Sequence, residues 1–147
     1  MKDEEVSYID MTKGDILSGF KMFYDMATFA PVSFRNSYES AANNDPNREQ
    51  ARIKVKDTDA NILLIAGTED MMWQSDVAAQ NIYDKRPENF EVLIYEGAGH
   101  VFFADWYFNA GNMNMALGGD IKRNGKAGHD SMKIIVDRLE KWHSQDN

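Results

Sequence analysis

Near the N-terminus, hydrophobic residues recur at the spacing of an amphipathic helix. The run starts after Asp15, which can cap a helix, and ends before Pro31. Its apolar members are Ile16, Leu17, Phe20, Phe23, Tyr24 and Ala27. We predict a helix over 15–27 whose apolar face packs in the core. Alternatively, this helix forms a lid whose apolar face covers a ligand. A second short helix is expected over 33–42, before a polar loop at 43–47.

After residue 51 the pattern changes to short, continuous apolar runs. Residues 61–67 (Asn-Ile-Leu-Leu-Ile-Ala-Gly) and 90–95 (Phe-Glu-Val-Leu-Ile-Tyr) predict two strands, the first of them buried on both faces. Between them, 75–85 predicts a helix. The residues expected to face inward from it are Val77, Ala78, Ile82 and Tyr83. A strand, a helix and a strand in this order form a parallel βαβ unit with a right-handed crossover.

The last predicted element is an amphipathic helix over 130–143. Its apolar face carries Met132, Ile135, Leu139 and Trp142, and its polar face carries Lys133, Asp137, Arg138 and Glu140. The fold class is therefore α/β with an incomplete sheet, because two parallel strands leave both edges free to pair. We expect one partial domain over 1–147, made of a helical lid or connecting segment at 1–50 and a βαβ-α unit at 51–147.

Composition narrows the classes of function. The 147 residues carry 16 Lys+Arg against 24 Asp+Glu, a net charge of −8, which disfavours nucleic acid and anionic membranes as partners. The absence of cysteine excludes a disulfide, a thiolate zinc site and a cysteine nucleophile. The first residues, Met-Lys-Asp-Glu-Glu-Val, are acidic where a secretory signal begins with basic residues, and no apolar run is long enough to span a bilayer. We expect a cytoplasmic protein.

The candidate chemistry lies directly after the two predicted strands. Open α/β sheets place their working residues in the loops past the carboxyl ends of the strands. Those loops read Gly-Thr-Glu-Asp, ending at Asp70, and Gly-Ala-Gly-His, ending at His100. Neighbouring strands lie about 4.8 Å apart, so the two side chains can meet. A carboxylate bonded to one imidazole nitrogen fixes the tautomer and leaves the other nitrogen as a base. We expect Asp70 and His100 to act as the acid and base of a triad.

These motifs resemble the C-terminal part of an α/β-hydrolase. More narrowly, 51–143 resembles the C-terminal catalytic domain of the acyl-CoA thioester hydrolase / bile acid-CoA:amino acid N-acyltransferase family. The narrower resemblance rests on three features. They are the Asp-x-x-Trp-x-Ser pattern of Asp70, Trp73 and Ser75, the Gly-Ala-Gly-His ending at His100, and the Gly118-Gly119 pair before Ala127 and a closing helix through Ser131 and Trp142.

The resemblance implies that Asp70 is the triad acid, that His100 is the general base, and that the substrate is an acyl thioester. The nucleophile of such an enzyme sits on a Gly-x-Ser-x-Gly turn, which this sequence lacks. None of its serines has the flanking glycines; they are Ser7, Ser18, Ser33, Ser37, Ser40, Ser75, Ser131 and Ser144. The leading hypothesis is the C-terminal half of a serine α/β-hydrolase that is inactive alone.

Two alternatives remain open. One keeps the fold but acts on a small ester or lactone, as dienelactone-hydrolase-like esterases do. The other is a catalytically inactive, truncated or split-chain fold. As partners we expect an acyl thioester or ester substrate and either a complementing chain that carries the nucleophile or a second copy paired through the open sheet edge.

The remaining candidates are aromatic. The segment after His100 holds Phe102, Phe103 and Trp106, which together with Trp73 are candidates to line an acyl pocket, although packing would also explain most of these rings. Residues 109–119 are expected to form a long irregular loop. No cofactor is expected, because Gly-Gly-Asp at 118–120 is not a phosphate-binding loop. No metal is expected either, because no His and carboxylate residues have ligand spacing on one element.

Overall fold

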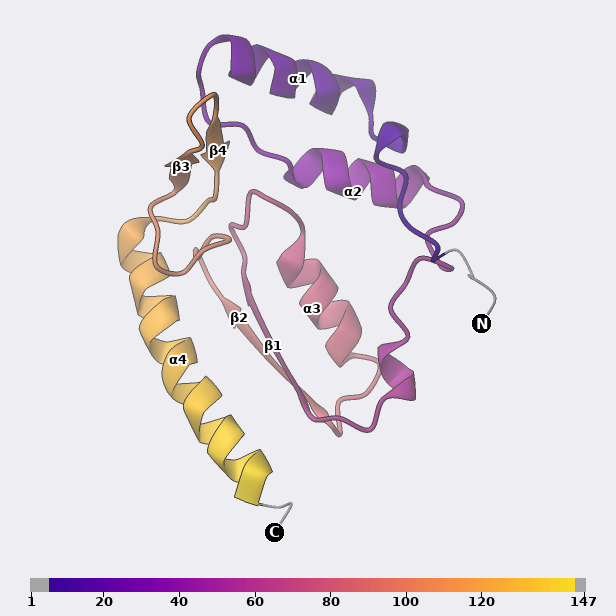
Figure 1. Cartoon of the computed structure of the whole chain (residues 1–147), viewed down its shortest axis with the longest axis vertical. Coiled ribbons are helices and arrows are strands. Elements are labelled where there is room, and N and C mark those ends of the chain that lie inside the picture. Colours follow the sequence, from indigo (N-terminus) through magenta and orange to yellow (C-terminus); the bar gives the residue numbers. More distant parts are fainter. Residues whose placement is uncertain (1–5, 145–147) are drawn as a thin grey trace.

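The computed structural model describes residues 6–144, so the first five residues of the acidic N-terminal segment lie outside the described part. Within residues 6–144, two short 3-10 turns, four helices and four strands follow one another (Figure 1). In order they are η1 (Met11–Lys13), α1 (Ile16–Ala27), α2 (Arg35–Asn44), η2 (Val55–Asp57), β1 (Ile62–Gly67), α3 (Ser75–Tyr83), β2 (Phe90–Tyr95), β3 (Tyr107–Asn109), β4 (Asn114–Ala116) and α4 (Ile121–Ser144).

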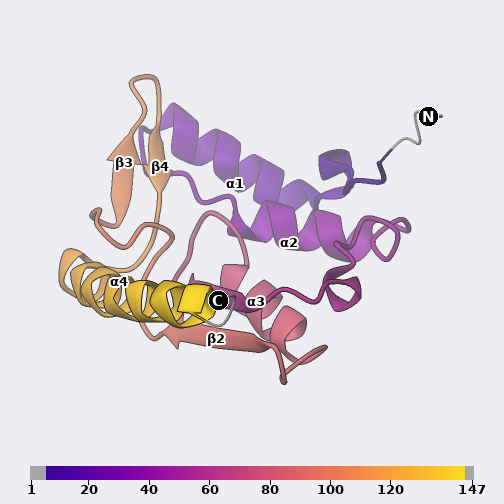
Figure 2. The same cartoon turned by 60° about the horizontal axis from the view of Figure 1, so that its bottom comes forward.

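The centre of the fold is the parallel pair β1 and β2, joined by α3. The register runs from Ile62 opposite Phe90 to Gly67 opposite Tyr95, as the apolar runs predict. Side chains alternate between the two faces of a strand. Glu91 and Tyr95 of β2 reach α4, through an ion pair with Arg138 and a hydrogen bond to Asp130. Helix α3 lies on the other side of the strands (Figures 1 and 2). The chain is therefore an α/β structure with a small parallel sheet.

Strand β1 is less buried than its sequence predicts. Its first four residues are half-buried, and only Ala66 and Gly67 are fully buried. On α3 the buried side chain is that of Ala79, whereas Val77, which we expected to face inward, is 47% exposed. Within residues 6–144 β1 pairs with β2 alone, so its other edge is unpaired.

Helix α1 forms where it is predicted but with the opposite face inward. Asp15 caps it by accepting a hydrogen bond from the Ser18 backbone N–H. The side that turns inward holds Ser18, Met22 and the buried Asp25, whose carboxylate pairs with Lys21 at 2.6 Å. The apolar stripe points to solvent: Ile16, Leu17, Phe20, Phe23 and Tyr24 are each at least 66% exposed. The expectation that this stripe packs in the core of the chain is wrong.

Helix α4 is longer than the predicted helix over 130–143. It begins at Ile121, where the Asp120 carboxylate accepts hydrogen bonds from the Lys122 and Arg123 backbone N–H groups. This longer helix contains Gly125 and Gly128, although glycine inside a helix costs about 1 kcal/mol. At Gly128 the helix passes so close to Phe102 that an added Cβ would lie 2.8 Å from its carbonyl oxygen, which explains the choice of glycine. Met132 and Leu139, expected on the packed face, are 59% and 48% exposed.

The expected irregular loop at 109–119 is instead partly a β-hairpin. Strands β3 and β4 pair antiparallel, with Phe108 opposite Met115. Met115 also forms a bridge with Val32, which is fully buried. The hairpin therefore fastens the N-terminal segment to the rest of the chain, a contact between distant residues that local spacing does not reveal.

The buried apolar residues of the described chain are few and mostly alanines. They are Val32, Ala41, Ala66, Ala79, Phe90, Ala98, Ala116, Leu117 and Ala127. Across residues 6–144, every helix falls short of the length and apolar content that a membrane span requires.

Candidate active site

The acid loop follows β1 and buries Asp70, which is 1% exposed. Both oxygens of its carboxylate are satisfied by donors from its own loop. Oδ1 accepts the backbone N–H of Met72 at 2.8 Å and that of Trp73 at 3.2 Å. Oδ2 accepts the Ser75 hydroxyl at 2.6 Å. These three hydrogen bonds fix the orientation of the carboxylate.

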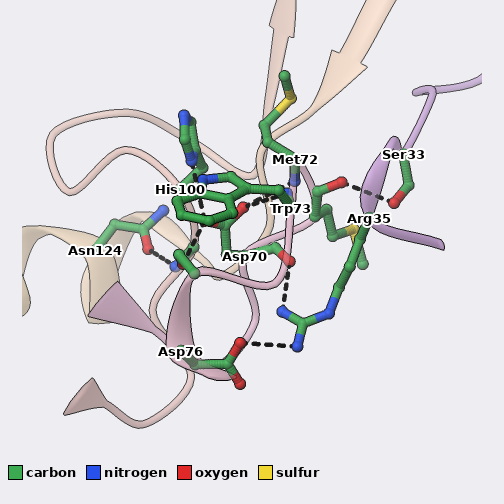
Figure 3. A network of polar contacts seen from close by, with 11 residues as sticks. Ser33, Arg35, Asp70, Met72, Trp73, Asp76, His100 and Asn124 are labelled. Atoms are coloured by element: carbon green, nitrogen blue, oxygen red, sulfur yellow. Dashed lines mark hydrogen bonds and ion pairs between the residues drawn. The ribbon is translucent and has the colours of Figure 1, made fainter. Parts of the chain in front are cut away.

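The second loop, after β2, brings His100 to the same carboxylate. Imidazole Nδ1 lies 3.0 Å from Asp70 Oδ2 (Figure 3). The His100 backbone N–H donates to the Leu117 carbonyl at 2.7 Å. An Nδ1–H bonded to the carboxylate leaves Nε2 with a free lone pair. In the part of the chain that the structure describes, Nε2 makes no hydrogen bond, and 36% of the side chain is exposed. The arrangement can therefore accept a proton from a group outside the described residues.

Asn124 on α4 holds the histidine loop in place. This fully buried side chain accepts the Gly99 backbone N–H at 2.8 Å and donates to the carbonyls of Ala104 at 2.9 Å and Gly118 at 3.3 Å. One amide thus joins α4, the histidine loop and the glycine turn before α4. Sequence reasoning missed Asn124, because a single asparagine in a polar stretch gives no signal of its partners.

The glycine turn at 118 and 119 lets these loops approach closely. Gly118 has a φ of +83°, and a Cβ added there would lie 1.7 Å from the Glu69 carbonyl oxygen. Gly99 is equally confined, since its Cβ would lie 2.1 Å from the Gly118 carbonyl oxygen. Only a residue without a side chain fits either position.

Arg35 at the start of α2 fixes the acid loop from the other side. Its Nη1 donates to the Asp70 backbone carbonyl at 2.9 Å, and its Nη2 pairs with Asp76 at 2.8 Å (Figure 3). The nearby Ser33 hydroxyl donates to the Met71 carbonyl at 2.8 Å. The N-terminal segment therefore supports the acid loop, a role that the sequence did not reveal.

The four aromatic candidates divide into two pairs. Phe102 and Phe103 line a groove of about 1050 Å³ that includes His100 and the adjacent face of α4. Trp73 and Trp106 do not line this groove. The Trp106 ring is tilted by 58° against that of Tyr107, with centroids 4.9 Å apart, and the Trp106 carbonyl accepts the backbone N–H groups of Leu117 and Gly118. Trp73 contributes its backbone N–H to Asp70, and its side chain is 42% exposed.

Tyr95, at the end of β2, anchors α4 next to the site. Burial raises the pKa of Tyr95 to about 12, and the hydrogen bond that its hydroxyl donates to Asp130 at 2.8 Å contributes to the rise. The phenol therefore stays protonated throughout the physiological range. Among residues 6–144, no cluster of three or more His, Asp or Glu side chains could hold a metal ion.

Comparison with known proteins gave one family. The family model described as BAAT / Acyl-CoA thioester hydrolase C terminal matches residues 23–144. The match covers most of the chain and includes Asp70, His100, both loops and the whole of α4. It also extends to part of α1 and all of α2, beyond the 51–143 segment on which the resemblance rests. A search of curated proteins found no match.

Proposed function

Since the chain belongs to the BAAT / acyl-CoA thioester hydrolase C-terminal family, we propose that it is the C-terminal half of a serine α/β-hydrolase that acts on acyl-CoA-type thioesters. In this proposal Asp70 is the triad acid and His100 is the general base. The observation that carries the proposal is the 3.0 Å contact between Asp70 Oδ2 and His100 Nδ1 at the carboxyl ends of adjacent parallel strands.

The proposed reaction follows from the free Nε2 of His100. A serine hydroxyl supplied from outside this sequence passes its proton to Nε2 while its oxygen attacks the thioester carbonyl. The C–S bond then breaks, and the leaving sulfur takes the proton from Nε2 and departs as the thiol. Water, deprotonated by the same nitrogen, hydrolyses the acyl-serine ester and releases the carboxylic acid. An amine in place of water would give an amide, as the N-acyltransferase members of the family imply.

The buried carboxylate supports the assigned roles. The Asp70 carboxylate accepts three donors from its own segment and faces the imidazole, so it is placed to stabilise the imidazolium formed when Nε2 takes the proton. We propose Phe102 and Phe103 as contacts for the acyl chain because they lie in the groove beside His100. For Trp73 and Trp106 we keep only a packing role. A chain without cysteine suits the reducing cytoplasm, where we place its activity.

One observation favours a second reading for the isolated chain. The sequence has no Gly-x-Ser-x-Gly, so the nucleophile and the oxyanion-hole amides that follow it are both missing. Alone, the chain is then expected to be inactive toward thioesters and toward small esters or lactones. Activity requires a segment that carries the nucleophile.

Two measurements test the proposal. Long-range ¹H–¹⁵N spectra of the isolated chain should show His100 with its proton on Nδ1, and Asp70→Ala should remove that preference. When a nucleophile-bearing segment is supplied, His100→Ala should lower acyl-CoA hydrolysis by about 10⁶-fold while substrate still binds. Turnover that is unchanged in His100→Ala would sink the proposal. Faster turnover of p-nitrophenyl esters than of acyl-CoA would instead favour the esterase alternative.

A further inference from the structure

Helix α1 presents a continuous apolar face to solvent. This α1 face consists of five side chains that are each at least 66% exposed: Ile16, Leu17, Phe20, Phe23 and Tyr24. The opposite side of the helix packs on α2, where the Ser37 hydroxyl donates to Met22 Sδ at 2.9 Å. Since α2 lies between α1 and the βαβ unit (Figures 1 and 2), the α1 face points away from the sheet.

The α1 face carries no charge, which narrows the class of partner. The two charged residues of the helix, Lys21 and Asp25, pair with each other at 2.6 Å, and Asp25 is buried. A helix that binds an anionic membrane is rich in Lys and Arg on its polar side, whereas α1 has a single lysine in a chain of net charge −8. A charged peptide would find no opposite charge on the face. The partner that fits is an apolar protein surface.

The size of the α1 face fits a second copy of this chain. Phe29, directly after the helix, is also 73% exposed and extends the apolar surface. An aromatic side chain carries about 150–250 Å², so Phe29 and the three aromatic residues of the face present roughly 400–700 Å² to solvent. The aliphatic members bring the total close to the roughly 800 Å² per partner that a standard protein interface buries.

Two features of this region have no explanation within residues 6–144. Phe29 has a φ of +57°, a left-handed conformation that costs a residue with a side chain about 1–2 kcal/mol, yet its ring is exposed. Gly19 lies in the middle of α1, where glycine costs about 1 kcal/mol relative to alanine, and a Cβ added there would meet no atom within 4 Å. A partner explains both, because it would bury the ring and would pack against the bare helix at Gly19.

A second copy supplies both a protruding ring and a hollow that receives it. In a two-fold dimer each partner uses the same patch, and the patch must be complementary to itself. A two-fold axis through the middle of α1 places Phe20 of one copy beside Phe20 and Gly19 of the other. We propose that two copies of this chain associate through their α1 faces in such a dimer. This pairing leaves the edge of β1 free and does not depend on the role of His100.

Sedimentation velocity over a range of concentrations tests the dimer. Phe20→Lys should raise the dimer dissociation constant at least about 30-fold, because a central interface residue is replaced by a charge that has no partner. Phe20 is 68% exposed in the single chain, so the urea midpoint of the monomer should stay unchanged. The matched control is Met132→Lys, at an apolar residue of α4 that is 59% exposed, and it should change the dissociation constant by no more than about twofold.

A mixture of two variants tests the two-fold arrangement. Phe20→Lys and Phe20→Glu should each be monomeric alone, because like charges would meet across the axis. Mixed, they should form heterodimers, since each ammonium then meets a carboxylate. Native mass spectrometry with one variant labelled with ¹⁵N identifies them. A mixture that stays monomeric would mean that Phe20 does not face its own copy, and it would overturn the two-fold pairing.

The other outcomes are equally decisive. A wild-type chain that is monomeric at every concentration overturns the inference. Dimers that Met132→Lys dissociates and Phe20→Lys does not would place the interface on α4, which also overturns it. If a monomeric chain floats with phosphatidylcholine vesicles and Phe20→Lys abolishes flotation, the α1 face binds lipid and the inference is wrong. Dimers that Phe20→Lys removes and the mixed charges restore support it, whatever His100→Ala does to turnover.

Discussion

The sheet edge that carries Asp70 and His100 is packed and hydrogen-bonded, whereas α1 exposes its apolar face to solvent. At the sheet edge, the buried Asp70 carboxylate meets four donors, from Met72, Trp73, Ser75 and His100. On α1, Phe20 and Phe23 are 68% and 72% exposed while the charged Asp25 is buried. The loops around Asp70 and His100 thus bury a polar group, whereas α1 exposes apolar side chains.

The difference shows which part of the structure has its polar groups hydrogen-bonded within the described chain and which part leaves apolar surface uncovered. The Asp70 carboxylate takes its hydrogen bonds from sequence neighbours and from His100, and Arg35 and Asn124 hold the two loops from α2 and α4. The exposed apolar side chains of α1 and α4 cannot be buried by residues next to them in sequence, because only another structural element can cover them. The chain thus holds Asp70 and His100 in a defined geometry, while much of the apolar surface of α1 and α4 is exposed.

The largest expected loss of stability comes from a substitution at Gly118, where the chain segments around Asp70 approach most closely. Gly118→Ala would place a methyl group 1.7 Å from the Glu69 carbonyl oxygen at a φ of +83°. Since neither backbone segment can move without displacing Asp70, we expect the free energy of unfolding to fall by more than about 4 kcal/mol. Urea denaturation measures it. Gly125→Ala is the control, because no atom lies within 4 Å of its added Cβ, and it should instead stabilise α4 by about 0.5–1 kcal/mol.

Removing the carboxylate should have the next largest effect. Asp70→Ala leaves the N–H groups of Met72 and Trp73 and the Ser75 hydroxyl without their acceptor, and we expect a loss of about 3 kcal/mol in unfolding free energy. The neighbouring Glu69, with a side chain 51% exposed, gives the matched control, and Glu69→Ala should cost no more than about 0.5 kcal/mol. Equal losses for the two variants would mean that the acid loop is not held by Asp70.

A smaller effect tests one donor in isolation. Ser75→Ala removes the 2.6 Å hydrogen bond to Asp70 Oδ2 and should cost about 1.5 kcal/mol, the lower range for a bond to a charged group. Ser75→Thr keeps the hydroxyl and should recover most of this loss. If Thr and Ala destabilise equally, packing around residue 75 and not the hydrogen bond is what matters.

A pH titration tests the hydrogen bond between Tyr95, at the end of β2, and Asp130 of α4. The pKa of Tyr95 is about 12 in the folded chain and about 10 in an unfolded one. The folded state therefore keeps a proton that the unfolded state loses, and the stability from this group is present below pH 10 and lost as the pH rises toward 12. Asp130→Asn should lower the pKa of Tyr95 part of the way, because burial remains. Titration of ¹³C-labelled tyrosine by NMR measures it, and an unchanged pKa would contradict the contribution of Asp130.

The smallest expected change in stability is on α1. Phe20→Ser with Phe23→Ser removes side chains that solvent already surrounds, so unfolding free energy should change by less than about 0.5 kcal/mol. Self-association in sedimentation velocity and the binding of a hydrophobic dye should both fall. Met22→Ser, on the inward side of the same helix, should cost more stability and leave association unchanged. A large loss of stability in the double variant would mean that the phenylalanines pack after all.

Elements that depend on local spacing were predictable from the sequence. The strands at 61–67 and 90–95 and the parallel pairing between them follow from apolar runs separated by a helix. The juxtaposition of Asp70 and His100 follows from that topology alone, because the carboxyl ends of adjacent parallel strands share an edge. The start of α4 and the hairpin of β3 and β4 were not predictable, since glycines at 125 and 128 and asparagines at 109–114 carry the signals of a loop.

Contacts between residues far apart in sequence required the tertiary structure. The hydrogen bond from Arg35 to the Asp70 carbonyl spans 35 positions, and the one from the Gly99 N–H to Asn124 spans 25. The sequence around a single polar residue does not indicate which distant group it will bond. The orientation of α1 is of the same kind. Its sequence determined that it is a helix with one apolar face, because that depends on spacing along the chain. Only the tertiary structure decided that the apolar face points outward, because burial depends on which other elements are present to cover it.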